Sequence, residues 1–205
     1  KADESGRVTD VIVDKLNEDF KLYINIMVMK RQHLLNVIEN AIAHGHHSFL
    51  RDIIMHSIGT AKYMTYDYHG FYAHIGSMAG YFECSMKLLE TDARDRLFGI
   101  KNRPVLTKVQ NSAPTVYAAN SMVKNSLIAD GCVIEGIVEN SIIFRGVKVG
   151  KGAKVKNCVL MQGTIVGENA NLDCVIADKN VIIRNSRTLT GCDTYPIVIG
   201  KGRNV

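Results

Sequence analysis

The chain has 205 residues, of which 46% are hydrophobic and 22% charged, an ordinary globular composition that allows one or two domains with a real core. Its net charge is +5 at pH 7, but the lysines and arginines are scattered and no aromatic platform accompanies them, so nucleic-acid binding is disfavoured. The sequence holds no apolar run of about 18 residues and no visible signal peptide, so we expect a cytoplasmic chain without a membrane span.

Five cysteines show no paired short spacing. We interpret Cys132, Cys158 and Cys174 as small buried hydrophobes in a reducing compartment. The chain begins at Lys1 rather than at a methionine, and we expect a fragment of a longer protein.

The first hundred residues contain apolar segments of two kinds, one typical of strands and one typical of helices. Runs rich in β-branched and aromatic residues predict strands at residues 8–13, 22–29 and 62–71, the second buried on both faces. Apolar residues spaced three to four apart predict helices at residues 31–44, 48–58 and 77–90. This mixture is typical of an α/β domain, and it ends near residue 100.

Residues 101–119 carry Pro104 and Pro114 and have no periodicity, so we predict a linker there. The predicted domains are therefore residues 1–100 and residues 120–205.

The second domain is a sequence repeat. Four of its repeat units, called lines below, begin with a similar motif, at Asn125, Asn140, Asn157 and Asp173. Aliphatic residues recur in columns, at Ile134, Val149, Val166 and Ile183, and at Val155 and Leu172. Within a line they recur near every sixth residue, which predicts a parallel β-helix whose coils each contain three short strands.

Two kinds of residue are expected at the corners of these coils. Small side chains suit the tight inner corners, and glycines suit turns that need a positive φ or a close backbone approach. The small residues are Ser141, Ala153, Cys158 and Ala170, and the glycines are Gly131, Gly146, Gly163 and Gly167.

Three histidines, His44, His46 and His47, are the obvious metal candidates, because three imidazoles within four residues can approach one ion. They lack a partner ligand at a standard zinc spacing. A helix C-terminus with Gly45 as its left-handed cap explains the same residues, so we assign no metal site.

Two Gly-Lys-Gly segments, residues 150–152 and 200–202, resemble phosphate loops, but neither opens a helix after a strand. We interpret both as turns of the repeat. Residues 70–77, Gly-Phe-Tyr-Ala-His-Ile-Gly-Ser, are a better candidate site, since a strand end followed by a helix N-terminus is where α/β folds hold anionic or sugar ligands. Ser77 also suits a plain helix N-cap.

The repeat sequence at residues 126–134, 138–142 and 178–181 resembles the C-terminal domain of the ADP-glucose pyrophosphorylases, also called glucose-1-phosphate adenylyltransferases. The resemblance implies a left-handed parallel β-helix of hexapeptide repeats, preceded at residues 1–100 by the C-terminal part of a Rossmann-like nucleotidyltransferase domain. It also implies Mg²⁺ for the full-length reaction, with no cofactor in this fragment.

The resemblance implies a sugar pocket, but this chain differs from active family members at the residues that contact the sugar. Active members read Gly-Tyr-Trp-x-Asp-Val-Gly-Thr where this chain has Tyr72, His74, Gly76 and Ser77. Their Phe-Val-Glu-Lys-Pro corresponds to residues 12–16, with Lys15 as the lysine that grips the sugar phosphate. These changes resemble the non-catalytic bacterial subunit, which partners an active subunit or itself, so we assign no catalytic residue and expect weak sugar-phosphate binding at most.

Two alternatives remain open. A hexapeptide-repeat acyltransferase would need a histidine base in the solenoid, yet all seven histidines lie at or before His74. A purely structural assembly module is the other, because the open ends of a solenoid expose strand edges that tend to pair.

Overall fold

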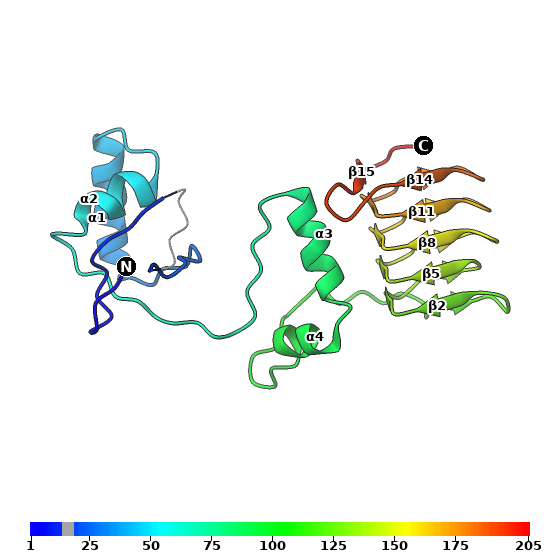
Figure 1. Cartoon of the computed structure of the whole chain (residues 1–205), viewed down its shortest axis with the longest axis horizontal. Coiled ribbons are helices and arrows are strands. Elements are labelled where there is room, and N and C mark those ends of the chain that lie inside the picture. Colours follow the sequence, from blue (N-terminus) through cyan, green and yellow to red (C-terminus); the bar gives the residue numbers. More distant parts are fainter. Residues whose placement is uncertain (14–18) are drawn as a thin grey trace. The chain divides into compact units, whose positions relative to one another are not determined.

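The computed structural model describes residues 1–13 and 19–205. The chain forms two compact units, Lys1–His69 and Gly70–Val205. Figure 1 labels their helices and strands.

Unit 1 contains the helices predicted near its middle. α1 spans Arg31–Ala43, a π-helix η1 spans Phe49–Ile54, and a short α2 spans Met55–Ser57. Ser48 precedes η1, and its hydroxyl oxygen accepts a hydrogen bond from the Arg51 backbone N–H at 3.2 Å. The predictions of helical structure at residues 31–44 and 48–58, with Ser48 as a cap, are therefore confirmed.

The strands predicted at residues 8–13, 22–29 and 62–71 are wrong. Between residues 1 and 69, the described part of the chain has only isolated antiparallel bridges, Ala2–Val8 and Arg7–Met64. A strand exists only through a ladder with a neighbour, and none of the described residues supplies one to residues 22–29. Val28 is consequently 98% exposed rather than buried on both faces.

Unit 2 is dominated by a solenoid that begins at residue 116. Its strands are β1 Val116–Tyr117, β2 Met122–Lys124, β3 Leu127–Ile128, β4 Val133–Ile134, β5 Ile137–Glu139, β6 Ile142–Ile143, β7 Lys148–Val149, β8 Lys154–Lys156, β9 Val159–Leu160, β10 Ile165–Val166, β11 Asn171–Asp173, β12 Val175–Ala177, β13 Ile182–Ile183, β14 Thr188–Thr190 and β15 Ile197–Ile199. They form three parallel five-stranded sheets, ordered β1-β4-β7-β10-β13, β2-β5-β8-β11-β14 and β3-β6-β9-β12-β15. The chain visits the three sheets in turn, so the predicted coils of three short strands are confirmed (Figure 1).

The core of the solenoid consists of the predicted aliphatic columns. Ile134, Val149, Val166 and Ile183 pair on neighbouring strands, and each is at most 1% exposed. One coil cannot bury its own inward face, and stacking shares that face with the coils on either side.

The fourth line of the repeat is shifted by one residue from its predicted alignment. Lys156 pairs with Asp173 and Val159 with Ile176, so the corner position of Asn157 falls to Cys174 rather than to Asp173. Asn157 and Cys174 both have a positive φ, 49° and 52°. The spacing to the next coil is therefore 17 residues, as in the aliphatic columns, because inward side chains must stack directly on one another.

The corners are filled as predicted. The four small residues, Ser141, Ala153, Cys158 and Ala170, are at most 1% exposed. Gly131, Gly146 and Gly163 have φ between 67° and 73°. Gly167 serves the other purpose, since a Cβ there would lie 2.5 Å from the backbone nitrogen of Asn185 on the next coil.

Gly136 offers a sharp test of this stacking. A Cβ at this position would overlap the carbonyl oxygen of Ala153 and would lie 2.8 Å from the carbonyl oxygen of Gly150, both backbone atoms that cannot turn aside. We expect Gly136→Ala to lower the free energy of unfolding by about 1–3 kcal/mol. Urea unfolding followed by circular dichroism measures the loss.

Gly200→Ala is the matched control, because an added Cβ there has no atom within 4 Å. We expect it to change stability by less than about 0.5 kcal/mol. Equal losses in the two variants would show that stacking contacts are not what disfavours a side chain at Gly136.

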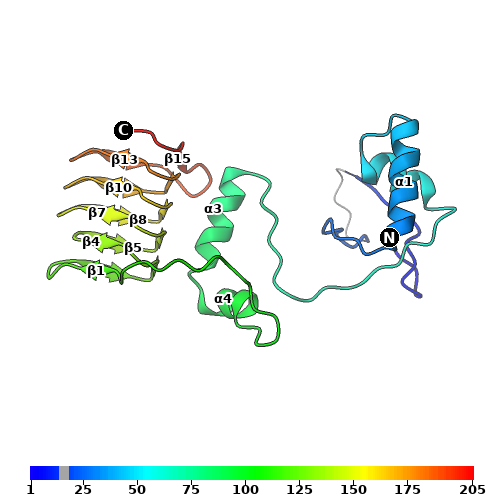
Figure 2. The ribbon, with the colours of Figure 1, turned by 180° about the vertical axis from the view of Figure 1, so that it is seen from behind.

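Two helices precede the solenoid within unit 2, α3 at Met78–Lys87 and α4 at Thr91–Phe98. α3 confirms the helix predicted at residues 77–90, whereas α4 was not predicted. Figure 2 shows α3 running beside the stack of coils. Residues 99–115 carry no helix or strand, whereas β1 lies within the predicted linker at residues 101–119. The predicted domain boundaries at residues 100 and 119 stay a prediction.

Phe82 anchors α3 to the solenoid. Its side chain is 2% exposed and packs with Val159, Cys174 and Ile176, flanked by Tyr81 and Met86. Val159 and Ile176 point outward from β9 and β12, so one solenoid sheet is apolar on both faces where the helix covers it.

Candidate functional site

The predicted sugar-binding turn is the extended segment that leads into α3. Ser77 is the N-cap of this helix, and its hydroxyl oxygen accepts a hydrogen bond from the Gly80 backbone N–H at 3.0 Å. The N-cap interpretation of Ser77 is therefore confirmed. A role in binding a ligand stays a prediction.

Tyr72, His74 and Gly76 lie in this same segment and are all exposed. The His74 ring folds over Gly76, where a Cβ would lie 2.8 Å from its Cε1 atom. The described residues thus place these three and Ser77 in one short, exposed stretch, in which Tyr72 is 42% exposed. The fifth predicted residue, Lys15, falls outside the described residues.

A groove opens between α3 and one corner of the solenoid, with a volume of about 920 Å³. The helix side contributes Ser77, Ala79, Gly80, Phe82, Glu83, Met86, Lys87, Leu89 and Glu90, and the solenoid side contributes Asn125, Asn140, Asn157, Asp193 and Thr194. In the sequence, the three asparagines mark the starts of successive lines of the repeat. Their recurrence in one column, at the start of successive lines, was the signal that could have indicated a shared surface.

The three asparagines occupy this corner for a backbone reason. Their φ angles are 43°, 44° and 49°, a left-handed conformation that asparagine tolerates better than most residues. Their amides take part in two separate hydrogen bonds between neighbouring coils, which we call the asparagine ladder. Nδ2 of Asn125 donates to Oδ1 of Asn140, and Nδ2 of Asn157 donates to Oδ1 of Asp173, both at 2.8 Å.

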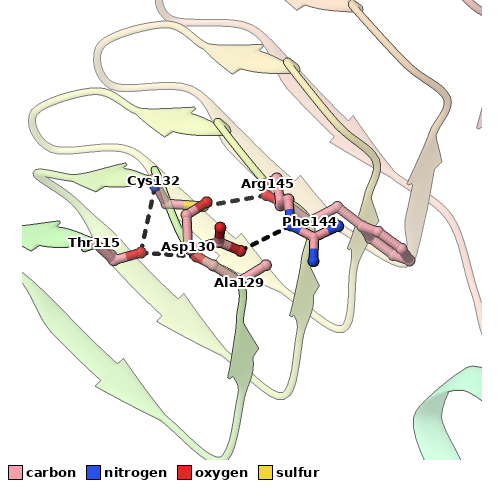
Figure 3. A network of polar contacts seen from close by, with 6 residues as sticks. All are labelled: Thr115, Ala129, Asp130, Cys132, Phe144 and Arg145. Carbon is pink, nitrogen blue, oxygen red and sulfur yellow. Dashed lines mark hydrogen bonds and ion pairs between the residues drawn. The ribbon is translucent and has the colours of Figure 1, made fainter. Parts of the chain in front are cut away.

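A second polar network closes the first corner of the solenoid (Figure 3). Nε of Arg145 donates to Oδ1 of Asp130 at 2.9 Å. The Thr115 hydroxyl donates to the carbonyl oxygen of Ala129 at 2.7 Å and accepts from the Cys132 backbone N–H at 3.3 Å. These bonds tie the end of the linker to the first coils, and we interpret them as structural.

The pKa of the Asp130 carboxyl is lowered, chiefly by a hydrogen bond from the Ser112 side chain and further by Arg145. A carboxyl with a lowered folded-state pKa contributes stability above its unfolded pKa of about 3.9, and the contribution is lost as the pH falls through the folded value. We therefore expect Asp130→Asn to lower the urea midpoint at neutral pH. The difference from the parent should shrink below about pH 4.

Glu168→Gln, at an exposed position on another corner, is the control, and we expect it to leave the midpoint unchanged at both pH values. A deficit of Asp130→Asn that stayed constant down to low pH would contradict the assigned role of the carboxylate charge.

The histidine segment forms the end of α1. Gly45 has a φ of 69°, its backbone N–H donates to Ile42, and the backbone N–H of His46 donates to Ala41. This pair of hydrogen bonds is a Schellman motif, so the left-handed cap is confirmed. Among the described residues, no three histidine, cysteine, aspartate or glutamate side chains come close enough to hold a metal ion.

The cysteines of the repeat are buried as predicted. Cys132, Cys158 and Cys174 are at most 5% exposed and form no disulfide. Burial raises the pKa of the Cys158 thiol to about 12, so it is a poor nucleophile at neutral pH.

The geometry defines the class of protein first. Stacked coils of three short parallel strands, with inward aliphatic columns and left-handed corners, are a hexapeptide-repeat β-solenoid. Residues 111–195 match a family described as GlmU-like, C-terminal hexapeptide. None of the helices in the described ranges is long and apolar enough to cross a membrane.

Similar sequences narrow the family further than the fold does. The chain is similar to glycogen biosynthesis protein GlgD of Bacillus subtilis, with 39% identity over 137 residues, which cover 67% of this chain and 40% of that protein. GlgD of Geobacillus stearothermophilus is 54% identical over 71 residues, 35% of this chain and 20% of that protein. Glucose-1-phosphate adenylyltransferase of Fervidobacterium nodosum is 33% identical over 139 residues, 68% of this chain and 33% of that protein.

The resemblance to the ADP-glucose pyrophosphorylases is thereby confirmed, and over its C-terminal part the chain is homologous to GlgD and to glucose-1-phosphate adenylyltransferases. The chain spans 40% or less of the length of these relatives.

Proposed function

We propose that the full-length protein is a subunit of a glucose-1-phosphate adenylyltransferase in glycogen biosynthesis, and that it modulates an active partner subunit rather than catalysing the reaction itself. The similarity to proteins named GlgD supports the pathway. The observation that carries the modulatory role is the exposed turn that holds Tyr72 and His74 where active members have tryptophan and aspartate.

The reaction of the active subunit defines what such a turn must do. An oxygen of the glucose 1-phosphate phosphate attacks the α-phosphorus of ATP, the bond to the β-phosphate oxygen breaks, and pyrophosphate leaves. Mg²⁺ supplies charge neutralisation to this step. Among the described residues, no three histidine, cysteine, aspartate or glutamate side chains come close enough to hold this ion.

The sugar must be held still while this displacement occurs. A carboxylate can accept hydrogen bonds from two neighbouring sugar hydroxyls, whereas a neutral imidazole has one acceptor nitrogen. His74 therefore offers less to a sugar than the aspartate it replaces, and Tyr72, at the position of the tryptophan, is 42% exposed. We infer weak sugar-phosphate binding at this turn.

The solenoid would then carry most of the function, as a surface for assembly in the cytoplasm with an active subunit or with a second copy. The acyltransferase alternative gains no support, since residues 116–205 contain no histidine to act as a base.

The test uses the full-length subunit, an active subunit from the same organism, and a mixture of the two. ADP-glucose formation is measured at saturating ATP and glucose 1-phosphate. We expect no turnover by the full-length subunit alone, and a changed kcat or KM of the active subunit in the mixture. Robust turnover without the partner would overturn the modulatory assignment.

A further inference from the structure

We propose that the groove between α3 and the asparagine corner binds a neutral saccharide. The groove shares Ser77 with the turn at residues 70–77, but Tyr72, His74 and Gly76 do not line it. The inference does not depend on the proposed catalytic partner. It is carried by the free hydrogen-bonding edges of the asparagine ladder, the excess of carboxylates that line the groove and the half-buried apolar side chains on its helix side.

The ladder presents unused amide edges to the groove. The bonds from Asn125 to Asn140 and from Asn157 to Asp173 each use one donor and one acceptor. Among the described residues, Oδ1 of Asn125, Nδ2 of Asn140 and Oδ1 of Asn157 have no hydrogen-bond partner within the protein. The corner therefore offers both acceptors and a donor, which is what a row of hydroxyl groups requires, since each hydroxyl both donates and accepts.

The charged residues on both sides of the groove select the charge of the ligand. Glu83 and Glu90 of the α3 region and Asp193 of the solenoid line the groove, with Lys87 as the single cation. Lys87 is paired with Glu83, its Nζ atom 3.4 Å from Oε1. An excess of carboxylates repels phosphates and nucleotides, so the ligand is not an anion.

A metal ion is also a poor fit, because the described residues bring no three ligating side chains together for one. An organic cation could use only the acceptors of the groove, whereas a neutral hydroxylated ligand can also accept from the free amide donor of Asn140. A neutral polar ligand therefore uses more of the groups that the groove offers.

The space and the apolar strip indicate a sugar. A volume of about 920 Å³ is in the range of small-molecule sites. Met86 and Leu89 are half-buried and line the groove, and the small residues Ala79 and Gly80 line it as well. Such a strip can cover the C–H face of a pyranose ring while amides and carboxylates bind its hydroxyls.

The experiment uses the whole chain with ¹³C-labelled methionine methyl groups, so that Met86 reports on the groove and Met161, which does not line it, serves as the internal reference. Maltotriose is the neutral probe, inorganic phosphate the anionic probe and spermidine the cationic probe. We expect maltotriose alone to shift the Met86 resonance, with saturation at a dissociation constant of about 1 mM, as befits an open site.

Two corner variants separate ligand contact from backbone strain. Asn140→Gly removes an amide from the groove while glycine keeps the positive φ. Asn169→Gly makes the same change at another corner, with a φ of 56°, outside the groove. We expect maltotriose binding to weaken about tenfold or more in the first and to be unchanged in the second.

Glu90→Gln provides a check that does not touch the solenoid. It keeps the shape of the wall and exchanges a strong acceptor for a neutral amide, and we expect weaker but measurable binding of maltotriose. The proposal is overturned if the Met86 resonance does not move, if it moves only with phosphate or spermidine, or if Asn169→Gly weakens maltotriose binding as much as Asn140→Gly.

Discussion

Replacing Leu172 with alanine is expected to lower the free energy of unfolding of the solenoid by about 2–5 kcal/mol. The Leu172 side chain is fully buried on β11 and pairs with Val155 on one neighbouring coil and Leu189 on the other. Removing its methyl groups loses their transfer free energy and leaves a cavity between two coils whose backbones are fixed by ladder hydrogen bonds. Because the coils around this cavity can relax only a little, we expect the loss of unfolding free energy to lie near the upper end of that range.

Urea unfolding followed by circular dichroism measures this loss. Ile165→Ala is the matched control, because Ile165 lies on the adjacent sheet but points outward and is 39% exposed. We expect the control to lose less than about 1 kcal/mol. Equal losses at the two positions would show that the inward column is not the core of the solenoid.

Replacing Phe82 with alanine is expected to release α3 from the solenoid. Large aromatic residues buried in a core contribute about 3–5 kcal/mol relative to alanine, and Phe82 is 2% exposed. The helix has only ten residues, too few for it to be stable on its own in water. The loss of this one anchor should therefore unfold α3 locally while the coils below it remain folded.

Hydrogen exchange of the α3 backbone amides distinguishes this local opening from global unfolding. We expect exchange in α3 to accelerate strongly in Phe82→Ala while the amides of β9 and β12 stay protected. Phe98→Ala, at a 53% exposed position on α4, should leave both sets unchanged. Unchanged protection of α3 in the Phe82 variant would mean that other contacts hold the helix.

The repeat was predictable because it is a local property of the sequence. Aliphatic columns at fixed spacing define the inward face, and small residues such as Ala153 and Ala170 mark the corners, without knowledge of distant contacts. One alignment within the repeat was wrong, that of Asp173 with Asn157. Similar residues follow these two positions in the sequence, which suggested a spacing of 16 residues. The inward columns hold the spacing at 17, so Cys174 takes the corner.

The candidate site was predictable only in part. The turn with Tyr72 and His74 was predicted from its sequence motif, and Ser77 was predicted as a helix cap from its position before an apolar periodic run. The groove was not found, because it combines residues from α3 with asparagines at the corner of successive coils and with Asp193 near the end of the chain. No local pattern connects segments that far apart.

The sequence by itself determined the solenoid, its core columns and the helices α1 and α3, since each rests on a period that one segment carries alone. Tertiary structure decided which other apolar runs became regular. Residues 22–29 have the composition of a buried strand yet form none, because a strand needs a neighbouring ladder. Tertiary structure also decided that α3 packs on the outward residues Val159 and Ile176, because burial of Phe82 requires an apolar surface that only the stacked coils provide.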